Sequence, residues 1–287
     1  MMSTQTSAPV LELEPTRAFP NRLPVPLLLR KAKEALESFA FTAAGFGILL
    51  VLWYLISRVT AGALPGPLAT GTVFWELIRD PFYDLGPNDK GIALQLFSSL
   101  GKVFLGFGLG SLVAIPVGMA MGANSFCNKM FYPIVQILKP VSPLAWFPIG
   151  LAVFQSAGTA TIFIIFITSL WSTLINTAFG VRSIPKDHKN VAKAFGFSTW
   201  RYITRILIPY SLPHIITGLR LSISVAWLVI VAGEMLSGGM GIGFFVWDSW
   251  NALSLEKVIC GILLIGLVGL LLDKGFALIE KRFSYEG

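Results

Sequence analysis

Four charged side chains lie within, or at the ends of, long apolar stretches of this sequence. They are Lys102, Lys139, Arg220 and Glu234. Charged groups in a bilayer usually face the interior of a helix bundle or extend to an interface. A cation that faces the interior would attract an anion, so these residues are candidates for lining a translocation pathway.

Lys139 is the strongest of these candidates because of the prolines around it. The stretch 131–154 contains prolines at positions 133, 140, 143 and 148, and each one removes a backbone donor and clashes with the preceding turn. We therefore expect a break in the helix between Pro140 and Pro148. Non-helical backbone at membrane depth survives only inside protein or along a wet cavity. The stretch is thus a candidate pathway wall that includes Lys139, Pro140, Pro143 and Trp146.

Arg220 and Glu234 share the apolar stretch 213–236. Arg220 lies about 10 Å, at helical rise, from the expected inner end, so it can face the pathway or extend to the interface. Glu234 is about 21 Å further along the helix, so the two side chains cannot pair directly. We expect Glu234 to cap or bond an outer gate.

The polar stretch 182–212 combines six basic residues with a pattern of small and aromatic residues. Ala192, Gly196 and Pro209 have a fixed spacing, with thirteen residues from the glycine to the proline. Near the glycine, a compact apolar knob is formed by Phe195, Phe197 and Trp200. Such anchors are typical of helix-in-groove recognition. A nucleic-acid patch or plain positive charge on a solvated loop would also explain the basic residues, but the spacing favours a docking helix.

Enzymatic motifs are missing from the sequence. The pair Gly101 and Lys102 is followed by Val103 and lacks the earlier glycine of a Walker A motif, so we expect another chain to hydrolyse any ATP. Glycines at positions 239, 241 and 243 are wrongly spaced for a dinucleotide loop and predict a flexible surface loop. Two cysteines and two histidines form no metal-ligand pattern.

Composition defines the class of protein. Of 287 residues, 54% are hydrophobic and only 13% charged, against about a quarter in soluble domains. Lys and Arg number five in residues 1–40, six in 181–212 and three in 274–287, but only two in 60–95. This unevenness follows the positive-inside rule. We therefore expect a multi-pass protein of the cell inner (plasma) membrane with both termini in the cytoplasm, lipid around it and no nucleic-acid partner.

The expected organisation is all-α. A cytoplasmic tail (1–40) precedes a six-span domain (41–280), which includes a cytoplasmic loop at about 182–212, and a second tail (281–287) follows. A surface helix at about 30–37 and an interfacial helix at about 72–79 are expected outside the spans. In the second span, glycines at 106, 110, 118 and 122 predict close packing against another helix. The expected spans are 41–59, 95–121, 131–154, 160–181, 213–236 and 258–272.

The stretch 190–209 resembles the loop signature of ABC importer permeases, including an Ile-x-x-Pro ending at Ile206–Pro209. The family usually has Glu-Ala-Ala where this chain has Asn190, Val191 and Ala192. The resemblance extends over roughly residues 40–280, through stretches such as KPVSPLAWFPI (139–149) and GLRLSISVAWLVIVAGEM (218–235). These are similar to the branch that imports nitrate, taurine, alkanesulfonates and bicarbonate, and most of all to its nitrate permeases.

The resemblance implies a type I ABC importer architecture and a complete machine. That machine has two permease copies, two cytoplasmic ATPase subunits that bind ATP and Mg²⁺, and an external binding protein, with no cofactor on this chain. The substrate it implies is a small inorganic anion, nitrate or nitrite, moved by alternating access. Bicarbonate, or a sulfonate such as taurine, is the alternative cargo. A secondary transporter is a further alternative, and a membrane-embedded enzyme is the least favoured one.

Overall fold

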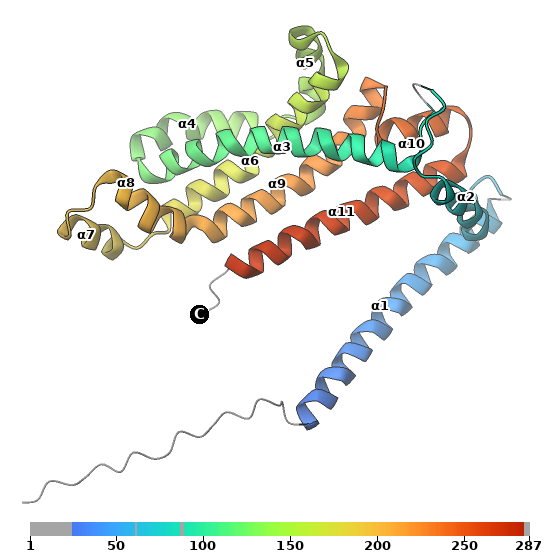
Figure 1. The fold of residues 1–287 in the computed structure, drawn as a ribbon, viewed down its shortest axis with the longest axis horizontal. Helices are drawn as coiled ribbons and strands as arrows, with labels where there is room; N and C mark the ends of the chain where they lie inside the picture. Colours follow the sequence, from blue (N-terminus) through green and yellow to red (C-terminus); the bar gives the residue numbers. More distant parts are fainter. Residues whose placement is uncertain (1–24, 61, 87–88, 284–287) are drawn as a thin grey trace, which may run out of the picture. The chain divides into compact units, whose positions relative to one another are not determined.

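The computed structural model describes residues 25–60, 62–86 and 89–283 (Figure 1). The chain forms two compact units, residues 1–60 and 61–287. In the first unit, helix α1 (Val25–Val59) has an apolar part, Leu36–Val59, of 24 residues. At about 1.5 Å per residue this part can cross about 30 Å of hydrocarbon. The surface helix expected at 30–37 is therefore not separate but continuous with the first span.

The second unit is built from helices, and its described residues contain no β-strand beyond an isolated bridge between Asp84 and Lys90. Its elements in chain order are α2 (Pro67–Arg79), α3 (Ile92–Ala123), α4 (Ser125–Leu138), the 3₁₀ turn η1 (Pro143–Trp146), α5 (Phe147–Phe154), α6 (Ala157–Arg182), α7 (Lys186–Ala194), α8 (Thr199–Tyr202), the π-helical turn η2 (Ile203–Leu207), α9 (Ile208–Ser237), α10 (Ile242–Asn251) and α11 (Leu255–Phe283).

Five described helical stretches are long and apolar enough to cross a membrane: the apolar part of α1, then α3, α6, the stretch Thr199–Ser237 and α11. A sixth candidate is α4 together with η1 and α5, which are bent by 97°. The break lies between Leu138 and Pro143. The break therefore lies near Pro140, at the start of the interval predicted for it. It does not extend to Pro148, because α5 already begins at Phe147 and a proline is tolerated in the first turn of a helix.

Helix α6 is the centre of the second unit, packed between α3 and α9. The four spaced glycines of α3 all face α6. A Cβ added to Gly106 would lie 2.7 Å from Ile165 Cβ, and one added to Gly118 would lie 2.7 Å from the Leu174 carbonyl oxygen. The predicted close approach of the second span is confirmed, and its partner is the fourth span.

On its other side, α6 is joined to α9 by buried hydroxyl groups. Ser222 Oγ donates to the Ser169 carbonyl oxygen at 2.7 Å and lies 2.8 Å from Thr173 Oγ1. The indole of Trp227 then donates to the Ile265 carbonyl oxygen at 2.9 Å, which links α9 to α11. The largest apolar cluster of buried residues includes this indole and joins α2, α3, α6, α9, α10 and α11.

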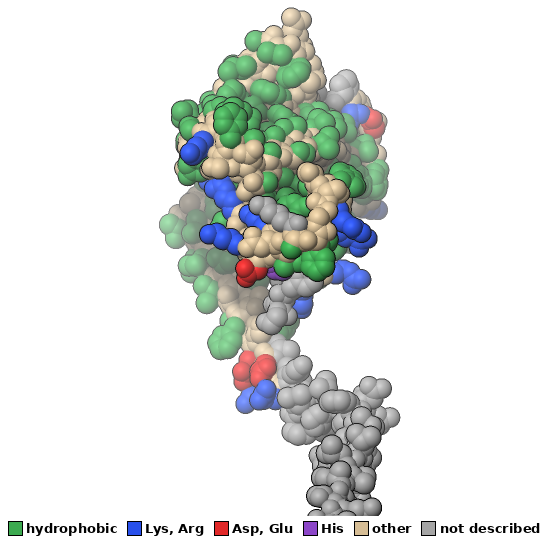
Figure 2. Space-filling view, turned by 90° about the vertical axis from the view of Figure 1, so that its left-hand side faces the viewer, with side chains coloured by type: hydrophobic (Ala, Val, Ile, Leu, Met, Phe, Trp, Pro, Cys, Tyr) green, Lys and Arg blue, Asp and Glu red, His purple; other side chains and the backbone are tan. Residues whose placement is uncertain are grey.

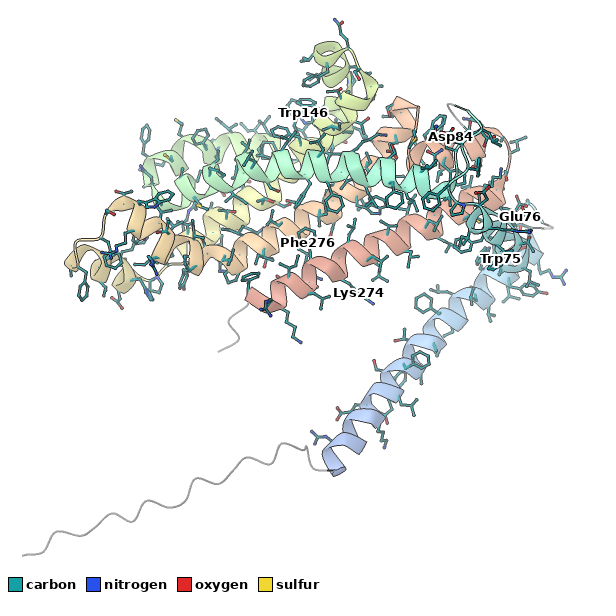
Figure 3. The ribbon with its side chains drawn as sticks, in the orientation of Figure 1. Trp75, Glu76, Asp84, Trp146, Lys274 and Phe276 are labelled. Atoms are coloured by element: carbon teal, nitrogen blue, oxygen red, sulfur yellow. The ribbon has the colours of Figure 1, made fainter. Side chains whose placement is uncertain are left out.

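The stretch that leads to the second span contains α2, longer than the interfacial helix expected at 72–79, with Trp75 69% exposed (Figure 3). Beyond it, Lys90 Nζ lies 2.5 Å from Asp84 Oδ2 across the isolated bridge. The hydrogen bond from this ammonium lowers the pKa of the Asp84 carboxyl below its ordinary value.

Several predicted boundaries were wrong. The inside loop expected at 123–130 is a single turn residue, Asn124, whose side chain accepts from the Phe126 N–H and starts α4. The span expected to begin at 213 begins earlier, because the helical stretch that contains α9 is continuous from Thr199 and includes both Pro209 and Pro213. The loop expected at 237–255 contains α10, and the last span continues to Phe283.

We predict opposite effects for two glycine substitutions in α3. Gly118→Ala should destabilise the protein by about 1–3 kcal/mol, because the new methyl overlaps the α6 backbone. Gly108→Ala is the matched control. Nothing lies within 4 Å of its added Cβ, so it should stabilise the helix by up to about 1 kcal/mol. Thermal unfolding in detergent measures both, and equal shifts would contradict the close packing of α3 and α6.

Candidate coupling surface and translocation residues

The predicted docking stretch folds as two short helices joined by a tight turn rather than as one helix. α7 ends at Ala194, and the Phe197 N–H returns to the Ala192 carbonyl oxygen at 2.9 Å. This closure places Gly196 in the left-handed region, with φ of 61°, where a residue without Cβ is favoured. Ser198 then caps α8 by accepting from the Arg201 N–H.

The turn divides the predicted docking residues into exposed and packed sets. Phe195 and Trp200 are 75% and 74% exposed. Ala192 is buried, and with the half-buried Phe197 it lines a hollow of about 310 Å³. Among the predicted residues, Phe195 and Trp200 are therefore the ones most available to a partner, while Ala192 and Phe197 support them. The remaining members of the predicted set, Asn190 and Pro209, are also exposed.

Helix α8 continues directly into a stretch that is long and apolar enough to span a membrane. α8, η2 and α9 together form the helical stretch Thr199–Ser237, 39 residues long. The π-helical turn η2 lies just before Pro209, and such turns inside α-helices are frequent at functional sites. One continuous helical stretch thus joins the exposed Trp200 to the buried Glu234.

Glu234 is fully buried and belongs to an ion pair. Its carboxylate accepts from Lys102 Nζ at 2.9 Å and from Ser99 Oγ at 2.7 Å, both on α3. It also accepts from the Gly243 N–H, in the first turn of α10, at 3.0 Å. Lys102 in addition donates to the Met240 carbonyl oxygen at 2.5 Å. The two candidate pathway residues therefore neutralise each other.

The same cluster holds the start of α10. The Gly241 N–H donates to Gln95 Oε1 at 2.6 Å, and the Ile242 N–H donates to Ser99 Oγ at 2.8 Å. Gly241 has φ of 154°, and a Cβ there would lie 2.1 Å from the Glu234 carboxyl. The flexible surface loop expected at the three spaced glycines is wrong for 241–243, since these residues are buried against Glu234.

Arg220 is also paired. Its guanidinium forms two hydrogen bonds to Asp273, at 2.7 and 2.8 Å, and one to Glu280 at 2.8 Å. Thr217 donates to the other Glu280 oxygen at 2.6 Å. Because α9 begins at Ile208, Arg220 lies about 18 Å from the start of that helix instead of the expected 10 Å. Its side chain is paired between α9 and α11, at the carboxylates of Asp273 and Glu280.

Lys139 differs from the other two cations. It follows α4 at the break, is exposed, and forms no ion pair or hydrogen bond through its side chain within the described part of the chain. Beyond it, Pro140 is exposed and Pro143 half-buried, and Trp146 has a buried indole nitrogen without a partner (Figure 3). All four residues belong to the bent pair of helices, at or next to its break.

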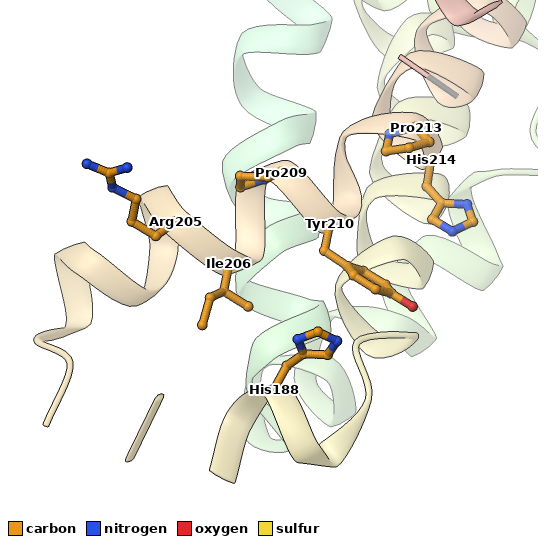
Figure 4. Close-up of a pocket in the computed structure, with 7 residues that line it drawn as sticks. All are labelled: His188, Arg205, Ile206, Pro209, Tyr210, Pro213 and His214. Atoms are coloured by element: carbon orange, nitrogen blue, oxygen red, sulfur yellow. The ribbon is translucent and has the colours of Figure 1, made fainter. Parts of the chain in front are cut away.

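A hollow of about 480 Å³ lies between α7 and the start of α9 and is lined by His188 and His214 among others. Arg205 borders this hollow, but its guanidinium points away from the two imidazoles (Figure 4). In the described residues no three metal-ligating side chains come together, and Cys127 and Cys260 are free.

Sequence reasoning identified Lys102, Arg220 and Glu234 but not their partners. Ser99 and Gln95 lie on the face of α3 that also carries Lys102, and Asp273 and Glu280 lie seven residues apart on α11. That spacing places both carboxylates on one face of a helix, and it was the available signal for them. It was missed because the last span was expected to end at 272.

The arrangement is that of a multi-pass membrane protein: helices long enough to span a bilayer, one bent candidate span, and two short helices joined by an exposed turn at one end. The chain matches the family described as binding-protein-dependent transport system inner membrane component over residues 106–285. It belongs to that family and is a multi-pass, non-enzymatic subunit of the inner membrane.

Curated relatives extend the likeness over most of the chain. It is 41% identical to a nitrate import permease protein of Synechocystis sp., over 83% of this chain and 87% of the relative. It is 46% identical to a bicarbonate transport system permease protein of the same organism, again over 83% and 87%. A solved structure of the MetNI methionine ABC transporter has the same fold, with a TM-score of 0.58 at 14% identity, covering 67% of this chain and 96% of that one.

We predict that Gly196→Val weakens docking while Gly196→Asn preserves it. Valine opposes the left-handed backbone, whereas asparagine tolerates it. No atom lies within 4 Å of an added Cβ, so the cost, about 1–2 kcal/mol, comes from the backbone alone. Retention of the ATPase subunit by affinity-tagged chains measures the effect, and equal retention by both variants would refute the role of the turn.

For the buried pair, Lys102→Ala should destabilise the protein by about 3–5 kcal/mol, because it leaves Glu234 as an uncompensated buried charge. The double variant Lys102→Met, Glu234→Gln should recover part of the loss. Lys139→Ala is the control and should change thermal unfolding little, since no ion pair is removed. A loss for Lys139→Ala as large as that for Lys102→Ala would contradict the assignment.

Proposed function

We propose that this chain is the membrane-spanning subunit of an ATP-driven importer of a small planar oxyanion, with nitrate as the leading substrate. The observation that carries the proposal is the continuous stretch Thr199–Ser237, which joins an exposed docking turn to the bundle core. Identities of 41–43% to nitrate permeases support the substrate. The 41–46% identities to bicarbonate permeases support bicarbonate to the same degree, so likeness alone does not separate the two substrates.

The complete transporter contains two copies of this chain, two ATPase subunits and an external binding protein. Each copy supplies one docking turn, and ATP is bound, with Mg²⁺, between two ATPase domains, so a single copy would leave one ATPase unused. The docking turn and both termini lie in the cytoplasm. The distribution of Lys and Arg along the sequence supports this orientation.

Transport proceeds by alternating access. Closure of the two ATPases moves the turn at Gly196, and the stretch Thr199–Ser237 carries that movement to Arg220 and Glu234. These residues bind α9 to α11, α3 and the start of α10. A push on the docking turn is thereby distributed over several helices, which rock together around the pathway.

Lys139 serves as the cation that attracts the anion. Among the three candidate cations at or within the spans, Lys102 and Arg220 are neutralised by carboxylates of the same chain. Lys139 keeps its charge free beside a proline break, where irregular backbone is tolerated along a wet cavity. Pro140, Pro143 and Trp146 form the adjoining wall.

ATPase activity in liposomes tests the proposal. Vesicles that contain the chain and its ATPase subunits should hydrolyse ATP faster when the binding protein outside is loaded with nitrate, and less so with bicarbonate or taurine. Stronger stimulation by bicarbonate than by nitrate would make bicarbonate the leading substrate and nitrate the second. Anion uptake by the purified chain without any ATPase would contradict an ATP-driven importer and indicate a secondary transporter.

A further inference from the structure

One side of α11 carries a continuous stripe of exposed side chains. Within the second unit only 17% of the most apolar part of this helix is buried, against 44% for α6. The stripe follows the helical repeat of three and four residues. We call it the outer stripe, and it consists of Leu267, Leu271, Lys274, Leu278 and Lys281, all exposed. It is therefore apolar along the span and cationic towards the end of the helix.

The opposite side of α11 faces the rest of the second unit. Phe276 packs edge-on against an aromatic ring of α3, with ring centres 5.7 Å apart. Figure 3 shows the side chains of Phe276 and Lys274 on opposite sides of the helix. The two acids of this half of α11, Asp273 and Glu280, are both paired with Arg220 of α9. These carboxylates are thus used inside the unit and leave the lysines of the outer stripe without a counter-charge.

The lysines of the outer stripe are free cations at the end of an apolar run. In the part of the chain that the structure describes, Lys274 and Lys281 form no ion pair or side-chain hydrogen bond. Lys274 comes two residues after the uncharged run 258–272. α11 ends at the same end of the second unit as α7 and α8 (Figure 1), where Figure 2 shows that basic side chains predominate over acidic ones. This is the depth at which phospholipid headgroups meet a spanning helix.

The spacing of the two lysines suits a single layer of phosphates. Lys274 and Lys281 lie seven residues apart, about 10 Å along the helix axis. The Cβ of Lys281 tilts back towards the span, and a lysine buried to its stem extends its ammonium to the interface. Both ammonium groups can therefore reach the same headgroup. Leu267 and Leu271 lie further along the span, at a depth that a soluble partner cannot reach but an acyl chain can.

We propose that the outer stripe binds an anionic phospholipid. Its phosphodiester lies between Lys274 and Lys281, and its acyl chain follows Leu278, Leu271 and Leu267. The charge complementarity selects an anionic lipid, because the ammonium of a zwitterionic headgroup offsets its own phosphate. With the orientation proposed above, the lipid belongs to the cytoplasmic leaflet. The binding itself does not depend on the proposed function, and its failure would leave that function intact.

The test counts lipids bound to the full-length chain, purified and freed of lipid in neutral detergent, by native mass spectrometry. Phosphatidylglycerol is compared with phosphatidylcholine of the same acyl chains. We expect wild type to bind phosphatidylglycerol about tenfold more tightly, and Lys274→Gln with Lys281→Gln to lose that preference. Lys274→Arg with Lys281→Arg should keep it. Lys186→Gln with Arg205→Gln is the matched control, because it removes the same charge from exposed residues of α7 and η2, and it should also keep the preference.

Three outcomes would overturn the proposal. An equal preference in wild type and the glutamine variant of α11 would show that the lysines do not select the lipid. Displacement of the lipid by soluble glycerophosphate would assign the lysines to a free phosphate. Lower retention of the ATPase subunit by the glutamine variant, with its lipid preference unchanged, would assign them to a protein.

Thermal unfolding separates lipid binding from a structural role of the charges. Cations near the end of a helix also stabilise it through the helix dipole. We expect all variants to unfold at one temperature without lipid, and phosphatidylglycerol to raise that temperature for every chain except the glutamine variant of α11. A lower temperature for that variant without lipid, together with the same rise as wild type on adding phosphatidylglycerol, would show a structural role and contradict the lipid site.

Discussion

The close approach of α6 to α3 and α9 is the constraint on which the second unit depends. Lipid is as apolar as a leucine side chain, so helices in a bilayer associate by van der Waals contact and hydrogen bonds rather than by the hydrophobic effect. α3 meets this requirement with glycines that place its backbone against α6. α9 meets it with hydroxyl groups, since Ser222 bonds to the α6 backbone. Helices α4, α5, α10 and α11 are then added around this trio.

The charged clusters attach the outer helices to that trio. Burying a carboxylate is costly unless each of its oxygens has a partner, and Glu234 has Lys102, Ser99 and the Gly243 N–H. Three successive N–H groups at the start of α10 are bonded by side chains of α3 and α9, and these N–H groups would otherwise lack partners. The cluster is therefore also the cap of α10. Arg220 attaches α11 to α9 in a similar way, by pairing with two carboxylates of α11.

What the sequence predicted correctly was local in origin. Glycine spacing in α3 indicated close packing, and clustered prolines indicated the break after Leu138, because both effects act within one or two turns. Pairing partners such as Lys102 and Glu234, more than a hundred residues apart, depend on how two helices are rotated against each other. Periodicity does not define that rotation. The start of the fifth span was misplaced for a different reason: the helix continues through both Pro209 and Pro213, with a π-helical turn just before Pro209, although proline normally disfavours a helix interior.

The distribution of compensated and free charge separates internal roles from external ones. Lys102 and Arg220 were candidates for binding an anion, yet each has carboxylates of the same chain as its counter-charge. A solute would have to compete with those carboxylates at a high desolvation cost. Lys139 has no such competitor among the described residues. On the proposed function, the free cation at the broken span meets the anion, and the exposed turn at Gly196 meets the ATPase. The paired cations hold together the helices that link the two.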